Sequence, residues 1–158
     1  PDAELVGFDV SEDSLGVARE RIPQVNFISQ WELVADKKYD LIFTSNVFHH
    51  IDATEHLLWL SRLRDTLTPD GKIIIFEHNP INPLTRMVFK RCIFDQNAVM
   101  IGKKNFTKLA KSAGFLKPIS KYTLFFPGAF RAFEPLERLI GWLPLGAQYF
   151  LLLRKSED

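Results

Sequence analysis

Asp9 lies between an apolar run and the start of a helix. The run of Leu5, Val6 and Phe8 is typical of a strand buried on both faces. Ser11, just beyond it, is a favoured N-cap for a helix. A carboxylate at such a strand end commonly binds ribose hydroxyls, because it offers two acceptor oxygens at the edge of the sheet. We predict that Asp9 binds a ribose; the alternative is that it only caps the following helix.

Two histidines follow a second apolar run, residues 41–44. The pKa of a free imidazole lies near neutral pH, so a neutral His49 or His50 is suited to act as a general base toward a substrate hydroxyl. The alternative for both residues is a structural or gating role. We predict that one of them takes part in catalysis.

Polar residues also end a later apolar run, GKIIIFEHN, which contains Glu77, His78 and Asn79. With Asp95 and the two histidines they suggest a metal site. A metal needs several converging ligands, however, and these residues fall on separate loops without local ligand spacing. We therefore expect no metal and interpret them as a polar rim around a substrate. Arg86 has the chemistry to pair a substrate carboxylate or phosphate bidentately, or else to cap a carbonyl end.

The elements that must position these residues alternate between strands and helices in the first half of the chain. The pattern predicts strands over residues 5–8, 25–29, 41–44 and 71–78, helices over 12–21 and 53–66, and a turn at 69–71. This order fits right-handed crossovers and a parallel sheet, and hence a doubly wound α/β fold.

The second half of the chain continues with shorter elements. We predict helices over residues 84–92, 106–113 with Asn105 as the cap, and 133–143, and strands over 118–126 and 147–155. The aromatic stretch 123–146 either shields an apolar substrate or packs the last helix on the sheet, and we favour packing. No repeat or linker interrupts the pattern, so residues 1–158 are predicted to form a single domain.

Composition limits the class of protein. The chain has 158 residues, of which 46% are hydrophobic, enough for one globular domain with a real core. It has no run of 18 uncharged apolar residues and no signal-peptide pattern, so we expect a cytoplasmic protein without membrane insertion. Cys92 is the only cysteine and has no metal-ligand spacing, which argues against redox chemistry.

Charge is distributed unevenly along the chain. Residues 1–85 carry 7 Lys/Arg against 14 Asp/Glu, a net charge of −7, whereas residues 86–158 carry 13 against 5, a net charge of +8. A basic second half can attract an anionic substrate. Its lysines fall mostly along one predicted helix without interleaved aromatic residues, so we expect no nucleic-acid binding.

The order of these motifs resembles the class I S-adenosylmethionine-dependent methyltransferases of the methyltransferase-domain or UbiE-like type. The matching pieces span nearly the whole chain: VGFDVSEDSLGVAR, YDLIFTSNVFHHI, LRDTLTPDGKIIIFEH, and the late AGF followed by two strands. The resemblance implies a Rossmann-like, mostly parallel sheet with an antiparallel last strand, and methyl transfer from S-adenosylmethionine to a small-molecule acceptor.

The resemblance also implies which residues bind the donor. Asp9 would hold the ribose, with Val10 beside it, and Gln30 would accept a hydrogen bond from the adenine amino group while Trp31 packs on the adenine face. The backbone of Ser45, Asn46 and Val47 would face the methionine part of the donor. For Gln30 and Trp31, the alternatives are a solvated loop residue and a core aromatic.

The chain departs from the family at its start. The family's first strand and its Gly-rich turn should precede Leu5, and neither is present in the sequence. We therefore expect a fragment of a longer protein, in which residues 5–9 pair directly with 41–45, or the unpaired strands associate with another copy, or the chain is poorly stable. We also predict that residues 147–154 form an antiparallel strand beside residues 71–78. A nicotinamide-dependent oxidoreductase and a non-catalytic binding module are the alternative functions.

Overall fold

The computed structural model describes residues 3–126, 132–133 and 135–155. Contacts along the chain divide it into two compact units, the first ending at Lys38 and the second beginning at Tyr39. Each unit is described by itself. Among the described residues, no helix has both the length and the apolar character needed to cross a lipid bilayer.

The first unit is a small strand-helix-strand-helix arrangement. It contains β1 (Val6–Phe8), α1 (Glu12–Arg21), β2 (Asn26–Ile28) and α2 (Trp31–Ala35), with β1 and β2 paired in parallel. Ser11 caps α1, because its side chain accepts a hydrogen bond from the Ser14 N–H at 3.2 Å. Since the two strands are parallel, their carboxyl ends lie at the same edge of this pair.

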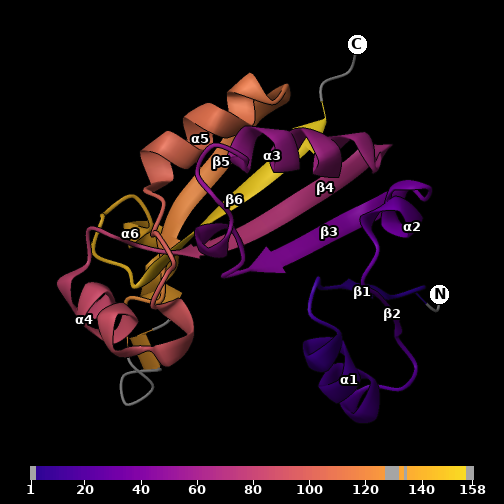
Figure 1. Cartoon of the computed structure of the whole chain (residues 1–158). Helices are drawn as coiled ribbons and strands as arrows, with labels where there is room; N and C mark the ends of the chain where they lie inside the picture. Colours follow the sequence, from indigo (N-terminus) through magenta and orange to yellow (C-terminus); the bar gives the residue numbers. More distant parts are fainter. Residues whose placement is uncertain (1–2, 127–131, 134, 156–158) are drawn as a thin grey trace. The chain divides into compact units, whose positions relative to one another are not determined.

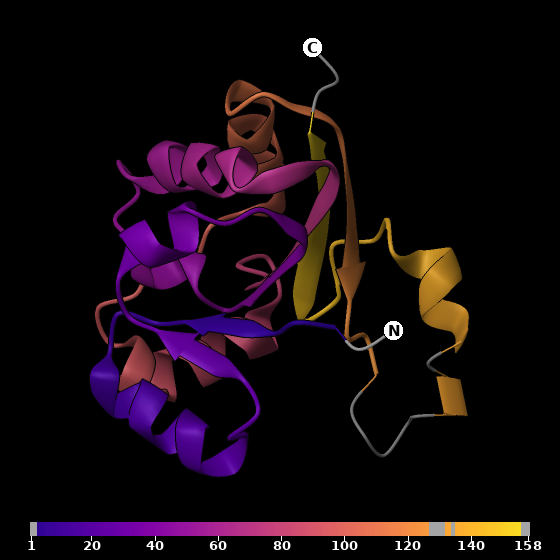
Figure 2. The same ribbon diagram turned by 90° about the vertical axis from the view of Figure 1, so that its right-hand side faces the viewer.

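The second unit is built on a mixed four-stranded sheet of order β3-β4-β6-β5, shown in Figure 1. The strands are β3 (Tyr39–Ser45), β4 (Leu67–His78), β6 (Gln148–Lys155) and β5 (Phe115–Thr123). β3 and β4 are parallel, whereas β6 runs antiparallel to both β4 and β5. Figure 2 shows the yellow β6 beside the orange-brown β5. The prediction of an antiparallel strand inserted beside the strand that ends at His78 is confirmed.

Helices α3 (His56–Asp65) and α5 (Lys103–Ser112) lie together on one side of this sheet (Figure 1). They bury alternate residues of the strands, since successive strand side chains point to opposite faces. The core therefore includes Ile73 and Ile75 of β4 together with Leu60 of α3 and Phe106 of α5, all fully buried. The remaining elements are η1 (Phe48–His50), α4 (Pro83–Arg91), η2 (Ile93–Asp95) and α6 (Glu137–Ile140).

Several predicted boundaries differ from the structure. Residues 69–71, predicted as a turn, lie within β4, where the pairing with β3 is irregular between Tyr39 and Leu41. Gly71 permits β4 to approach the backbone of Tyr39 closely, because a Cβ at this position would lie only 2.8 Å from the Tyr39 carbonyl oxygen. Asn105 does not cap α5, which begins at Lys103 after Gly102. β5 begins and ends three residues earlier than predicted.

One further expectation is corrected. The helix predicted over residues 133–143 is the four-residue α6, and the aromatic stretch predicted over residues 123–146 lies partly outside the described residues. Among the described residues, β1 is paired with β2 and β3 with β4.

Candidate functional site

A buried carboxylate closes the row of core residues on β4. Ile73, Ile75 and Glu77 point to the same face because strand side chains alternate, and Glu77 is as fully buried as the two isoleucines. A charge in such a position must be paired and fully hydrogen-bonded. The surroundings of Glu77 therefore explain the rest of the site.

Glu77 accepts hydrogen bonds from three successive residues of the loop after β3. Its Oε1 accepts from the backbone N–H groups of Val47 at 3.1 Å and Phe48 at 2.7 Å. Its Oε2 lies 2.7 Å from Nδ1 of His49, which is itself almost fully buried. The carboxylate thus holds Nδ1 as the protonated nitrogen of His49, and Nε2 is left facing away from it.

The loop reaches Glu77 because the chain turns sharply at Asn46. This residue has a φ of 57°, in the left-handed region that asparagine tolerates better than most residues. Its N–H donates to the Phe76 carbonyl at 2.9 Å, and its side-chain oxygen accepts from Gln148 at 3.2 Å. Neighbouring β4 and β6 therefore both hold the turn that leads into η1.

Asp95 faces the other side of the histidine pair. Its Oδ1 lies 3.4 Å from Nε2 of His49 and 3.4 Å from Nε2 of His50. Asp95 is largely buried, whereas His50 is exposed. The segment after η2 is tied to the same place, because the Val99 N–H donates to the His49 carbonyl at 2.8 Å.

The local charges shift the pKa of two histidines in opposite directions. Burial lowers the pKa of His49, but its hydrogen bond to Glu77 and the negative charges of Glu77 and Asp95 outweigh burial, so the pKa lies above its usual value. The pKa of His78 is lowered by burial and by the neighbouring His49. The ring of His78 lies 5.2 Å from that of His49, and Phe89 packs against both edge-on.

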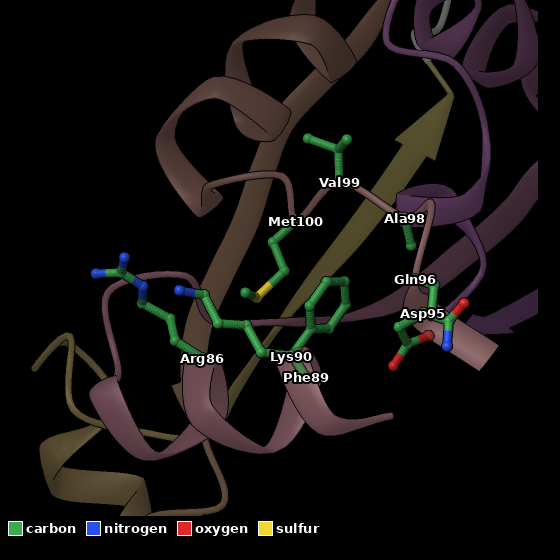
Figure 3. Close-up of a pocket in the computed structure, with 8 residues that line it drawn as sticks. All are labelled: Arg86, Phe89, Lys90, Asp95, Gln96, Ala98, Val99 and Met100. Atoms are coloured by element: carbon green, nitrogen blue, oxygen red, sulfur yellow. The ribbon is translucent and has the colours of Figure 1, made fainter. Parts of the chain in front are cut away.

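A cavity of about 410 Å³ opens beside this cluster (Figure 3). Asp95 and Gln96 line one side of it, and Arg86 and Lys90 of α4 line the opposite side. The two cations are one helical turn apart and therefore share a face of α4. The other lining residues are mainly apolar: Phe89, Ala98, Val99 and Met100.

The predicted nucleotide-binding residues of the first unit follow the strand ends. Asp9 is exposed, and its Oδ1 accepts from the Ser11 N–H at 2.8 Å, so it supports the start of α1 while Ser11 is the cap. Val10 and Gln30 are exposed as well. Trp31 packs edge-on against Phe8, with ring centroids 5.6 Å apart. Asp9 and Gln30 therefore stand at one edge of the β1–β2 pair.

The predicted residues of the second unit lie at the end of β3. Ser45 and Val47 are exposed, and Asn46 is half-buried. The Val47 N–H is engaged by Glu77, as described above. The structure thus joins Val47, His49 and His50 through Glu77 and Asp95 in a single network.

The sequence marks some members of this network, but it does not show that they contact one another. Glu77 ends the apolar run IIIF at the two-residue spacing of Ile73 and Ile75, which is the signal of a carboxylate on the buried face of the strand. Asp95 follows α4 in a short turn, with no spacing that links it to the histidines. The contact of Asp95 with His49 and His50 depends on tertiary packing.

Comparison with known proteins shows what the chain is similar to. Residues 1–73 match a family model described as a methyltransferase domain. A trans-aconitate 2-methyltransferase of Rhodopseudomonas palustris (strain BisA53) is 30% identical over 100 residues, which cover 61% of this chain and 38% of that protein. The first part of the chain is therefore similar to a methyltransferase domain. The match spans about two fifths of the length of this curated relative.

Solved structures show the same methyltransferase fold. An S-adenosylmethionine-dependent methyltransferase from Archaeoglobus fulgidus superposes with a TM-score of 0.73 at 16% identity, over 95% of this chain and 75% of that one. Haemonchus contortus phosphoethanolamine N-methyltransferase 2, in complex with phosphomonomethylethanolamine and S-adenosylhomocysteine, superposes with a TM-score of 0.62 at 16% identity, over 98% of this chain and 44% of that one.

The residues present fit the adenosine part of the family's methyl donor. Asp9 is an exposed carboxylate whose Oδ1 is bonded within the chain. An ionised carboxylate can accept further hydrogen bonds at its second oxygen, which suits a ribose hydroxyl. Gln30 stands at the same strand-pair edge with an amide oxygen that can accept from an amino group.

Replacement of Glu77 tests the network. Glu77→Gln keeps the side-chain size but turns one acceptor oxygen into a donor amide, which then faces another N–H. We expect the variant to have a free energy of unfolding lower by about 1–3 kcal/mol, which is the cost of a buried polar group left without its partner. Urea denaturation of the full-length protein measures this, with the exposed Glu55→Gln as the matched control. Equal midpoints for the two variants would contradict the central role of Glu77.

Proposed function

We propose that the full-length protein transfers a methyl group from S-adenosylmethionine to a small-molecule acceptor. The observation that carries the proposal is the methyltransferase fold combined with a cavity beside the buried His49–Glu77 pair. In this proposal Asp9, Val10, Gln30 and Trp31 bind the adenosine part of the donor. Ser45, Asn46 and Val47 border its methionine part, since ligands of such sheets lie outside the carboxyl ends of the strands.

The donor supplies a methyl group made electrophilic by a positively charged sulfonium. The chain's own contribution is to align an acceptor atom with that methyl group, and alignment alone can supply much of the rate. For a hydroxyl acceptor, Nε2 of His49 or His50 receives the proton while the carbon–oxygen bond forms and the carbon–sulfur bond breaks. His49 and His50 are thus the proposed catalytic residues.

We further propose that the acceptor is anionic. Arg86 and Lys90 line the cavity opposite Asp95, and within the described part of the chain no hydrogen bond or ion pair engages either cationic side-chain group. Such a pair of cations favours a carboxylate or phosphate. The name of the relative, trans-aconitate 2-methyltransferase, supports a carboxylate.

The alternative functions differ in what they would bind. An oxidoreductase would bind a nicotinamide cofactor, but the antiparallel β6 beside β4 favours the methyltransferase. A non-catalytic module would bind neither cofactor. Calorimetric titration of the full-length protein with S-adenosylhomocysteine and with NAD separates the three functions, and heat with NAD alone would overturn the proposal.

Replacement of Asp9 tests the ribose contact. We expect Asp9→Ala to weaken the affinity of the full-length protein for S-adenosylhomocysteine by about 1.5–3 kcal/mol, the range for hydrogen bonds to a charged group. Asp13→Ala in the first turn of α1 is the control and should leave the affinity unchanged. If titration calorimetry gave equal affinities for both variants, Asp9 would serve only the start of α1.

Replacement of the cavity cations tests the acceptor class. With trans-aconitate as the trial acceptor, we expect Arg86→Gln and Lys90→Gln each to raise KM about tenfold or more, corresponding to about 1.5 kcal/mol for a lost charge-assisted contact. Arg91→Gln is the control on the same helix, because Arg91 is exposed but does not line the cavity. A larger effect of Arg91→Gln would contradict the assignment.

We also propose that residues 1–158 form a single methyltransferase domain, and that the longer protein contributes a further strand and a Gly-rich turn before Leu5. Within the described part of the chain, β1 pairs only with β2 and β3 only with β4, so each strand has one edge without a strand partner. Exposed strand edges are templates for pairing with another chain.

This arrangement predicts the association state. We expect the 158-residue chain alone to self-associate or unfold at low denaturant concentration, and to bind S-adenosylhomocysteine weakly, whereas the full-length protein is monomeric at the same concentration. Light scattering coupled to size-exclusion chromatography compares the two. A monomeric, cooperatively folded and tightly binding 158-residue chain would show that the additional strand is not needed.

A further inference from the structure

We propose that His49, His50 and Asp95 form a binding site for a divalent transition-metal ion of the zinc class. The ligand atoms are Nε2 of each histidine and Oδ1 of Asp95, which all lie within 4.8 Å of one another. The sequence did not predict such a site, because its ligands lie on separate segments. The proposal rests on the geometry of these side chains and does not depend on the proposed methyl transfer.

The distances suit ligands that share an ion. Zinc bonds of about 2.0–2.1 Å in a tetrahedral arrangement place neighbouring ligand atoms about 3.3 Å apart. Oδ1 of Asp95 lies 3.4 Å from Nε2 of each histidine. A charge-assisted hydrogen bond between such groups is typically shorter, about 2.7–2.9 Å. The two distances to Asp95 therefore match ligands around an ion better than direct hydrogen bonds, and the ligand atoms of the two histidines lie within 4.8 Å of each other.

Glu77 orients one of the proposed ligands, His49. A histidine that binds a metal typically donates its other N–H to a carboxylate, which fixes the tautomer and the orientation of the ring. Glu77 holds Nδ1 of His49 at 2.7 Å in this way, and its other oxygen is fixed by two backbone N–H groups. When His49 is neutral, Nε2 presents a lone pair toward Asp95, so that two acceptors face each other. Either a proton on Nε2 or a metal ion held between the two atoms resolves that conflict.

The charge balance and access also favour an ion. The two carboxylates of Glu77 and Asp95 together offset the charge of a divalent ion, and the histidines stay neutral as ligands. Two imidazoles and a carboxylate are donors that zinc accepts. Asp95 also lines the cavity, and His50 is exposed, so the site has an opening toward solvent and room for a further ligand. The ion would lower the pKa of an acceptor hydroxyl bound there, so that the hydroxyl releases its proton to solvent water and needs no imidazole base.

Metal titration tests the proposal without a methyl donor. The full-length protein is stripped with a chelator, and Co²⁺ is added while its visible d–d absorption is recorded; Zn²⁺ then displaces it. We expect one ion per chain and an intense, four-coordinate spectrum. Failure of stoichiometric binding overturns the proposal and leaves the proposed methyl transfer standing, since alignment and an imidazole base suffice for it.

Variants assign the ligands. We expect His50→Ala to lower the affinity for Zn²⁺ at least tenfold, and because His50 is exposed this variant is expected to fold. Asp95→Asn should have a similar effect, and Glu77→Gln should weaken binding about 10–100-fold through the orientation of His49. His78→Gln is the control, because His78 is close to His49 but outside the ligand set. Equal affinity of His50→Ala and the unaltered protein would show adventitious binding and overturn the proposal.

Discussion

The buried carboxylate of Glu77 is the constraint on which the second unit's site depends. A carboxylate removed from water is tolerated only when its oxygens are fully hydrogen-bonded, and the three donors to Glu77 come from the consecutive residues 47–49. The loop after β3 is thereby fixed on the end of β4. The same contact sets which nitrogen of the buried His49 carries the proton, so a packing requirement of the core also fixes the chemistry of this imidazole.

Much of this fold follows from patterns that are local in sequence. Alternating or continuous apolar runs predict β3, β4 and β6, and the apolar length of residues 147–154 correctly predicts an inner antiparallel strand. Strand ends also place Asp9, His49 and His50, since parallel strands put their carboxyl ends at one edge. Asp95 is different. Its approach to the histidines depends on how α4 and η2 pack, and no residue spacing encodes that contact.

Element boundaries were less predictable because side-chain propensities compete with tertiary pairing. A Pro-Asp-Gly sequence favours a turn, but Gly71 lets the backbone of β4 approach the Tyr39 carbonyl closely, so the strand continues. Asn105 is a strong cap in isolation, yet α5 begins at Lys103, and the Thr107 hydroxyl donates to the Lys103 carbonyl at 2.8 Å.

The cavity beside Glu77 separates charges of opposite sign. Arg86 and Lys90 stand on one side, and Asp95, backed by His49 and Glu77, stands on the other. An anion drawn to the cations would orient with its negative group toward α4 and its remaining atoms toward the histidines. If Asp95 were left with its full charge, it would repel the same anion. A cation held by Asp95, whether a proton on His49 or the proposed metal ion, would remove that repulsion, and the occupancy of the histidine cluster would then control how the proposed anionic acceptor binds.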